Sequence, residues 1–186
     1  AMDIVRTVLT GEVNQELVEA MHRHGSMAVG LSGTDASTIV AEPADPRLGR
    51  VGCITSINPA LIHDLVAADY IPVIASVAVG ADGGAFNINA DVAAGHVAAA
   101  IGAHKVVFLT DVDGLFMDYP DPASLVSAMT LDETRQLIET DAVASGMIPK
   151  LGSCVRALEA GVQRAHIING TTPHSLLLEL LTDKGI

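Results

Sequence analysis

Three short polar segments of this chain combine residue types and spacings that suit phosphoryl transfer. They are Asn87-Ile-Asn-Ala-Asp91, Asp111-Val-Asp-Gly-Leu115 and Gly146-Met-Ile-Pro-Lys150. Asparagine amides can hold a ligand that carries both a carboxylate and an amide group, and glycine lets a nucleotide approach the backbone. A lysine can stabilise the charge on a transferred phosphoryl group. The three segments therefore suit a small anionic substrate, a nucleotide and a cation.

The first segment has a functional and a purely structural interpretation. Asn87 and Asn89 are two residues apart, so in extended backbone their side chains point the same way and can bind one ligand. The alternative is a turn and a helix cap, because Asn is a common N-cap residue. Asp91 falls in the first turn of the predicted helix, where the dipole favours a carboxylate. Its functional alternative is to hold lysine side chains in place.

The second and third segments are expected at the ends of buried elements. Asp111-Val-Asp-Gly114 follows a strand, and ligands gather at the carboxyl ends of strands in doubly wound sheets, although Asp-Gly is also an ordinary turn. Lys150 follows Pro149 at a predicted helix start, where a lysine opposes the helix dipole. A bound phosphate would compensate for this, and the alternative is a solvated lysine.

The elements that must position these segments alternate between strand and helix. We expect strands at 28–31, 37–42, 50–57, 71–76, 105–110 and 166–169, and helices at 4–24, 59–69, 90–101, 131–140, 150–160 and 173–181. Gly80 to Gly84 should form a tight turn from which 85–88 pairs back as a hairpin. The alternation predicts an α/β fold, a three-layer α/β/α sandwich with a mostly parallel central sheet.

Composition excludes several classes of function. The 186 residues include 22 acidic and 10 basic ones, for a net charge of −12, so nucleic acid and anionic membranes are poor partners. Neither a signal peptide nor an apolar run of membrane-spanning length occurs, and a cytoplasmic location is expected. Cys53 and Cys154 are isolated in apolar segments and should be reduced and buried. The scattered histidines predict no metal site, and P-loop and dinucleotide fingerprints are absent.

Several segments, taken in order, resemble a known family. They are Gly30-Leu-Ser-Gly33 with Asp35-Ala36, Tyr70-Ile-Pro-Val-Ile74, Asn87-Ile-Asn-Ala-Asp91, Leu109-Thr-Asp-Val-Asp-Gly-Leu115, Gly146-Met-Ile-Pro-Lys150, and His166-Ile-Ile-Asn-Gly170 running into His174-Ser-Leu-Leu-Leu-Glu179. Together they resemble the amino-acid kinase family and, within it, the acetylglutamate kinases of arginine biosynthesis. The resemblance covers essentially the whole chain, and its specificity lies in the combination of segments.

The resemblance implies an ATP-dependent transfer of the γ-phosphoryl group to the side-chain carboxylate of N-acetyl-L-glutamate, with Mg²⁺ accompanying ATP. It makes Lys150 a transition-state-stabilising lysine and Asp91 the residue that orients the catalytic lysines. Asn87 would bind acetylglutamate, with Asn89 and Ala90 beside it. The implied nucleotide-binding residues are Asp111, Val112, Asp113, Gly114, Leu115, Phe116, Ala144, Gly146 and Met147.

The resemblance also implies a division of the chain and an assembly. Residues 1–88 would belong to the acetylglutamate-binding and dimerisation half and residues 89–186 to the ATP-binding half. The longer parent would form a homodimer or a higher homo-oligomer. His166, Glu179 and Gly185 fit the basic residue, acidic residue and glycine that arginine-inhibited members use near the C-terminus, which suggests an effector site.

Departures from the family pattern limit these expectations. The family begins with a strand that carries a second catalytic lysine beside a Gly-Gly loop, then a second glycine-rich loop and a substrate-binding arginine. We therefore expect a chain truncated at both ends, with little activity alone and an active parent. The open alternatives are a related kinase for acetylaminoadipate, glutamate, aspartate or carbamate, and a catalytically dead nucleotide-binding module.

Overall fold

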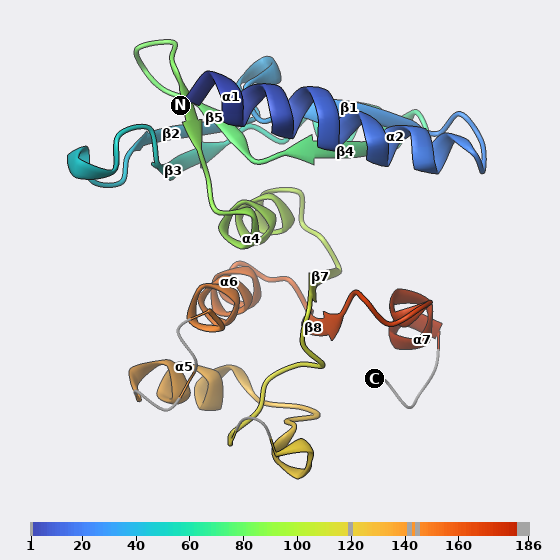
Figure 1. Ribbon diagram of the computed structural model, residues 1–186, viewed down its shortest axis with the longest axis vertical. Helices are drawn as coiled ribbons and strands as arrows, with labels where there is room; N and C mark the ends of the chain where they lie inside the picture. Colours follow the sequence, from blue (N-terminus) through green and yellow to red (C-terminus); the bar gives the residue numbers. More distant parts are fainter. Residues whose placement is uncertain (1, 119–120, 141–142, 144–145, 182–186) are drawn as a thin grey trace. The chain divides into compact units, whose positions relative to one another are not determined.

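The computed structural model describes residues 2–118, 121–140, 143 and 146–181, which fall into two compact units (Figure 1). The first unit is Ala1–Ile101 and the second is Gly102–Ile186. No helix among the described residues is long and apolar enough to cross a membrane. The predicted elements all appear, with boundaries shifted by a residue or two at several ends, as is usual for helix termini.

The first unit opens with a helix that changes its winding along its length. It consists of α1 (Met2–Arg6), the π-helical η1 (Thr7–Val13) and α2 (Asn14–His22). Asn14, at the start of α2, is buried and donates its side-chain amide to the carbonyl oxygens of Val73 (2.7 Å) and Leu31 (3.4 Å). These bonds attach the helix to two strands. The sequence predicted a helix here but not its π-helical turn.

The strands of the first unit form two sheets rather than one. β1 (Ala28–Ser32) and β4 (Ile71–Ala75) pair in parallel. The second sheet has the order β3-β2-β5-β6, built from β2 (Ile39–Pro43), β3 (Gly52–Ile57), β5 (Val77–Val79) and β6 (Ala85–Asn87). Its β2–β3 and β5–β6 pairs are antiparallel, and β2–β5 is parallel. Two antiparallel hairpins thus make this sheet mixed.

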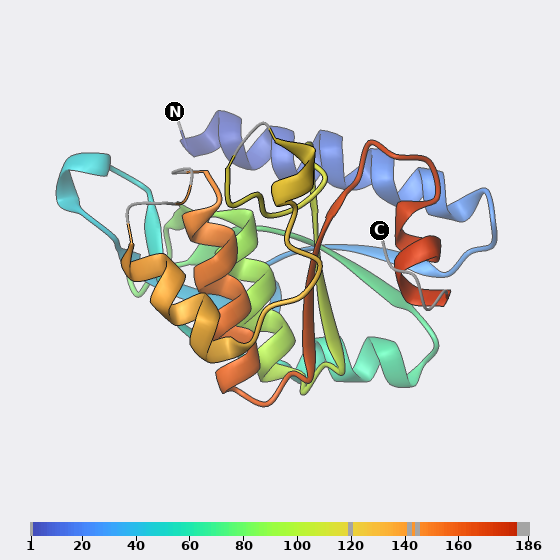
Figure 2. The ribbon, with the colours of Figure 1, turned by 90° about the horizontal axis from the view of Figure 1, so that it is seen from below.

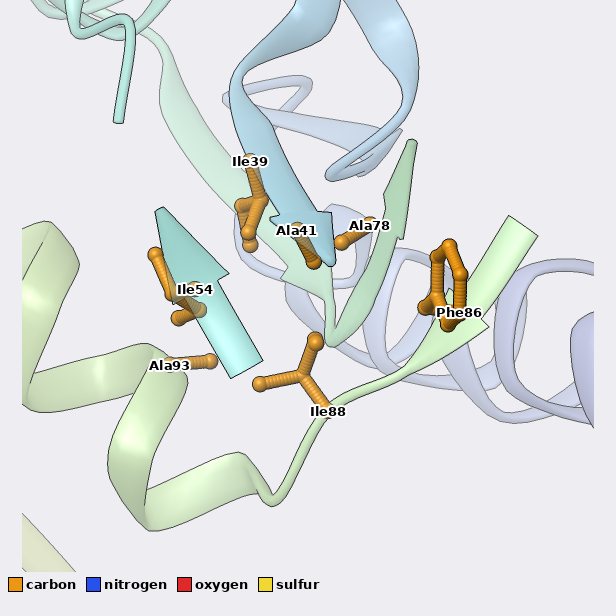
Figure 3. Close-up of a cluster of buried hydrophobic side chains, with 7 residues drawn as sticks. All are labelled: Ile39, Ala41, Ile54, Ala78, Phe86, Ile88 and Ala93. Carbon is orange, nitrogen blue, oxygen red and sulfur yellow. The ribbon is translucent and has the colours of Figure 1, made fainter. Parts of the chain in front are cut away.

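Two helices complete the first unit. α3 (Ala60–Ala67) contacts β4, and α4 (Ala90–Ala100) contacts β3. Buried apolar side chains of the four-stranded sheet meet Ala93 of α4 (Figure 3). That cluster contains Ile39, Ala41, Ile54, Ala78, Phe86, Ile88 and Ala93. Gly102 follows α4 with a φ of 63°, the left-handed conformation expected after a helix end.

The second unit is built on one parallel pair of strands. β7 (Lys105–Thr110) and β8 (Arg164–Asn169) run side by side, as Figure 2 shows. α6 (Ile148–Glu159) contacts both strands and α5 (Leu131–Glu139), while α7 (Ser175–Leu181) contacts β8. Leu115, Leu137, Met147 and Leu151 form its buried apolar cluster.

Two sequence-based expectations need correction. The α/β class is confirmed, but the described strands form three sheets, one of them mixed, instead of a single mostly parallel sheet. Cys154 is buried as expected, whereas Cys53 is exposed. On β3 the buried position is Ile54, and strand alternation therefore turns its neighbour Cys53 to the opposite face. Both cysteines are free thiols.

Candidate functional site

A cavity of about 410 Å³ lies in the second unit where β7 ends and α6 begins. Its lining joins the loop after Thr110 to the first residues of α6. The complete lining is Thr110, Asp111, Val112, Gly114, Leu115, Phe116, Val143, Gly146, Met147 and Lys150. The second and third sequence segments, which are more than 30 residues apart, therefore meet around one space. Its volume falls within the usual range of small-molecule sites, about 300–1,000 Å³.

The loop that follows β7 is held in place by its own backbone and by one buried side chain. Gly114 has a φ of 150°, and a Cβ atom there would lie 3.2 Å from Cδ1 of Leu125. A side chain is therefore disfavoured at this position both by conformation and by space. Leu115 is buried, and its carbonyl oxygen accepts a hydrogen bond of 2.8 Å from the N–H of Val126. These contacts leave the polar start of the loop at the cavity.

The α6 end of the cavity favours an anion. Lys150 is the third residue of α6, after Ile148 and Pro149, and its side chain is half-buried. Among the described residues, the N-cap of this helix, Met147, makes no side-chain capping hydrogen bond, and the first turn presents backbone N–H groups at the helix start. The partial positive charge of the helix N-terminus adds to that of the ammonium group. A phosphate group fits these donors better than any neutral ligand does.

Some predicted nucleotide-binding residues lie elsewhere, and others were not predicted. Asp113 does not line this cavity but borders another one of about 290 Å³, and its Oδ1 accepts a hydrogen bond of 2.8 Å from Nδ2 of Asn169 on β8. Ala144 lies outside the described residues. Thr110 lines the cavity without having been singled out, whereas Val143 belongs to the segment 142–147 that the resemblance assigns to the nucleotide site. Thr110 could have been found from the sequence, because it is the last residue of the strand that precedes the acidic turn.

The first segment occupies the end of β6 and the start of α4. Asn87 is the last residue of β6, is half-buried, and has no side-chain hydrogen bond to the described residues. Its backbone N–H donates to the carbonyl oxygen of Arg50 at 2.8 Å. Asn89 is the N-cap of α4, where its Oδ1 accepts from the N–H of Val92 at 3.1 Å. The capping alternative is thus realised at Asn89, while the side chain of Asn87 remains able to bind a ligand.

The residues after Asn89 have separate surroundings. Ala90 is exposed and borders an apolar cavity of about 260 Å³, which Asn14 also lines. Asp91 is half-buried in the first turn of α4, where the helix dipole stabilises its charge. Of the four predicted residues of this segment, Ala90 is the one that lines this 260 Å³ cavity.

The suggested effector residues are partly brought together. Nδ1 of His166 on β8 contacts Oε1 of Glu179 on α7, and their side chains are only 15% and 12% exposed. Nε2 of His166 is buried without a hydrogen-bond partner among the described residues. Both residues border a further cavity of about 290 Å³. Gly185 lies outside the described residues.

The carboxylates near the 410 Å³ cavity suit a metal ion that enters together with a nucleotide. Among the described residues, no group of three or more His, Cys, Asp or Glu side chains could hold a metal ion. Mg²⁺ in phosphoryl-transfer sites needs only one or two carboxylates, because substrate phosphates and water supply the other ligands. Asp111 provides one carboxylate in the lining of the 410 Å³ cavity.

Comparisons with known proteins place the chain in a family. The model of the amino acid kinase family matches residues 1–169. The acetylglutamate kinase of Moorella thermoacetica is 45% identical over the whole chain, which spans 66% of that relative's length. The crystal structure of smu.665 from Streptococcus mutans is similar to this chain, with a TM-score of 0.79 and 29% identity. The match covers 90% of this chain and 67% of the smu.665 chain. The structure of N-acetylglutamate synthase from Neisseria gonorrhoeae, complexed with coenzyme A and N-acetyl-glutamate, is also similar, with a TM-score of 0.73 and 29% identity. The match covers 93% of this chain and 41% of the synthase chain.

Proposed function

The chain belongs to the amino acid kinase family, and from this premise we propose that it is the larger part of an acetylglutamate kinase. The proposed reaction is ATP-dependent. A side-chain carboxylate oxygen of N-acetyl-L-glutamate attacks the γ-phosphorus, the bond to the β–γ bridging oxygen breaks, and an acyl phosphate and ADP form. The chain spans about two thirds of the relative's length, and we propose this activity for the protein as a whole.

One observation carries the nucleotide part of the proposal. The cavity between the end of β7 and the start of α6 combines backbone turns, a helix N-terminus and Lys150. These groups complement the negative charge of a triphosphate, and the apolar part of the lining suits a nucleoside. Phosphoryl transfer requires mainly positioning and charge stabilisation, which such a cavity can supply without a covalent intermediate. Mg²⁺ would enter with ATP, with Asp111 as its protein carboxylate.

Within this reaction we assign separate roles to charged side chains. Lys150 stabilises the charge on the transferred phosphoryl group, an effect of about 3–4 kcal/mol for a single preorganised donor. For Asp91 we propose the role of orienting catalytic lysines, in line with the family resemblance. Asp111, Val112, Gly114, Leu115, Phe116, Gly146 and Met147 bind the nucleotide. Asp113, whose carboxylate is bonded to Asn169, would act by holding the turn in shape.

The acceptor is assigned through Asn87. Its side chain is half-buried and makes no hydrogen bond to described residues, so its amide can both donate to a carboxylate and accept from an amide N–H. N-acetyl-L-glutamate offers both groups. Asn89 and Ala90 would border the same ligand, with Asn89 also capping α4.

The decisive experiment measures ADP formation by the full-length product of the gene with MgATP and several acceptors. We expect turnover with N-acetyl-L-glutamate that exceeds turnover with N-acetyl-L-2-aminoadipate, L-glutamate, L-aspartate and carbamate. Preference for another of these acceptors would identify a different kinase of the family. ATP binding without phosphorylation of any acceptor would favour a nucleotide-binding module instead.

Assembly, location and regulation follow as further parts of the proposal. We propose a cytoplasmic homo-oligomer with an α/β/α sandwich in which residues 1–88 belong to the acceptor half and residues 89–186 to the nucleotide half. The exposed apolar residues Ile4, Val8, Val13 and Leu17 of the first helix suit a subunit interface. Light scattering tests the assembly.

Regulation by arginine rests on a separate pair of residues. Glu179, paired with His166, is a suitable partner for a guanidinium group, because arginine and carboxylate form strong charge-assisted hydrogen bonds. Inhibition of wild type by L-arginine, with loss of that inhibition in Glu179→Gln, tests the effector proposal. An uninhibited wild type would contradict it and leave the kinase assignment unaffected.

A further inference from the structure

The hairpin that ends at Asn87 is held from one side by a single arginine. Arg50 precedes β3, whereas the hairpin consists of β5, the turn at 80–84 and β6. The guanidinium group of Arg50 reaches the hairpin at three places. Nη1 lies 2.8 Å from Oδ2 of Asp82, and Cζ lies 5.0 Å from the centre of the Phe86 ring.

The third contact is with the backbone between these two residues. A Cβ atom at Gly84 would lie 2.8 Å from Nη1 and 3.0 Å from Nη2 of Arg50, so the guanidinium group occupies the space beside this glycine. Asp82, Gly84 and Phe86 are spaced two apart, and the arginine therefore runs along one edge of the turn and β6. Phe86 is itself buried in the apolar cluster, so the contact is anchored in the core (Figure 3).

The backbone of Arg50 holds the next residue of the same strand. Its carbonyl oxygen accepts a hydrogen bond of 2.8 Å from the N–H of Asn87, and Val51 forms a parallel bridge with Asn87. On the other side, Asn87 pairs with Val77, which is completely buried. Asn87 is thus fixed between β5 and the segment that carries Arg50.

A hydrogen bond within the turn at 80–84 orients Asp82 toward Arg50. One carboxylate oxygen of Asp82 accepts the N–H of Gly84 at 2.9 Å, while the other faces Arg50. These hydrogen bonds, the Gly84 N–H first and the Arg50 guanidinium second, lower the pKa of Asp82. The carboxylate therefore stays charged near neutral pH and keeps its attraction to the arginine.

We propose that Arg50 is a positioning residue for acceptor binding: its side chain holds the β5–β6 hairpin against the start of β3 and so fixes the place of Asn87. The proposal rests on the acceptor role assigned to Asn87. Arg50 acts through the hairpin and does not itself contact the substrate, so its loss should weaken acceptor binding while the chemical step is retained. An Asn87 that is free to shift gives poorer hydrogen-bond geometry with the same ligand groups.

Arg47 provides a matched control. It also forms an arginine–aspartate pair at the surface, with Nη2 of Arg47 at 2.6 Å from Oδ2 of Asp45, and this pair joins two residues of one short turn outside the hairpin. Arg47→Ala removes the same charge from the same unit. Any effect of net charge or of the loss of an exposed ion pair is therefore common to Arg47→Ala and Arg50→Ala.

The test is steady-state kinetics of the full-length gene product with MgATP and N-acetyl-L-glutamate. We expect Arg50→Ala to raise the KM for N-acetyl-L-glutamate about threefold to tenfold, on the scale of one exposed ion pair plus one cation–π contact. The kcat and the KM for ATP should stay within about twofold of wild type. The KM of Arg50→Lys for N-acetyl-L-glutamate should lie between those of wild type and Arg50→Ala, because lysine keeps the attraction to Asp82 but lacks the planar guanidinium that lies over the Phe86 ring. Arg47→Ala should match wild type.

A glycine substitution tests the same contact from the other side. Gly84→Ala places a methyl group where the guanidinium lies, and the backbone of Gly84 is not in the left-handed region. It should raise the KM for N-acetyl-L-glutamate in the wild-type background and have little further effect in Arg50→Ala. If Gly84→Ala and Arg50→Ala raised the KM for N-acetyl-L-glutamate additively, the proposal would be contradicted. It would also be contradicted if Arg50→Ala lowered kcat and raised the KM values for N-acetyl-L-glutamate and ATP equally.

Amide hydrogen exchange separates this proposal from the kinase assignment. Arg50→Ala should speed exchange at the N–H of Asn87 more than at the N–H groups of β1 and β4, and this readout needs no substrate. Faster exchange in a protein that lacks kinase activity would support the positioning role and contradict the proposed function. Unchanged exchange at Asn87 with an unchanged KM would overturn the role of Arg50 in an active kinase.

Discussion

The proposed nucleotide cavity of the second unit and the Asn87–Asp91 segment of the first unit are organised differently. In the second unit, two short sequence segments that are distant along the chain converge on one cavity. In the first unit, neighbouring residues serve different purposes. Asn87 ends a strand, Asn89 caps a helix and Ala90 borders an apolar cavity.

This difference concerns what holds each side chain in place. Gly114 and the start of α6 are positioned by local turns and by the helix axis, so the sequence nearby contains most of the information. Asn87 is positioned by partners that are distant in sequence, among them Arg50 and Val77. Substitutions in the second unit should therefore act directly on binding and chemistry. Those in the first unit should act through supporting contacts as well.

The largest effect is expected at the cation of the nucleotide cavity. Lys150→Ala in the full-length protein should lower kcat by about 10²–10³-fold, because a preorganised donor to the transferred group is lost. The KM for N-acetyl-L-glutamate should change little in the same steady-state assay. Lys105→Ala is the control, since Lys105 lies at the opposite end of β7 from the cavity. An unchanged kcat in Lys150→Ala would remove this lysine from the catalytic assignment.

The second effect contrasts the two asparagines of the first segment. Asn87→Ala should raise the KM for N-acetyl-L-glutamate about tenfold to a hundredfold, the value of a hydrogen bond to a charged group. Asn89→Ala removes a helix cap and should instead lower the free energy of unfolding by about 1 kcal/mol. Acceptor kinetics and urea unfolding of both variants separate the roles. If Asn87→Ala lowered kcat/KM equally with every acceptor, Asn87 would have no part in acceptor selectivity.

The sequence was sufficient for the α/β class and the order of elements, since periodicity and turn chemistry are local. It also singled out the two segments that line the 410 Å³ cavity, whose nucleotide-binding role stays a prediction. It was not sufficient for the mixed sheet, because hydrophobic alternation does not distinguish parallel from antiparallel neighbours in hairpins such as β2–β3. The contacts of Asp113 with Asn169 and of Asn87 with Arg50 join distant positions. Composition and spacing hold no information on such pairs.

A third effect tests whether backbone conformation shapes the nucleotide cavity. Gly114→Ala should cost about 1–2 kcal/mol of stability, because its φ of 150° disfavours a side chain and Leu125 is close. It should also weaken ATP binding measured by calorimetry. Gly152→Ala is the matched control, because Gly152 lies within α6 with nothing within 4 Å of its Cβ position, and alanine there should stabilise the helix. A destabilisation shared by both variants would contradict a special role for Gly114.

The smallest effect compares the helix caps of the two units. Asn89 caps α4 with a neutral amide, whereas Thr130 and Glu133 form a reciprocal capping box at the start of α5. Hydrogen bonds from Thr130, its hydroxyl first and its backbone N–H second, lower the pKa of Glu133 below its ordinary 4.5. A lowered pKa gives stability that is present above the ordinary value and is lost as the pH falls through the lowered one.

Thr130→Ala should therefore cost about 1 kcal/mol in urea unfolding near neutral pH and less as the medium becomes acidic, while the cost of Asn89→Ala should not follow this trend. Glu133→Gln should flatten the acid loss of stability relative to wild type. Glu139→Gln, at the other end of α5, controls for the removal of one charge from the same helix. A cost of Thr130→Ala that does not change with pH would mean that the ionised Glu133 carboxylate adds nothing to this cap, and the two helix starts would then be equivalent.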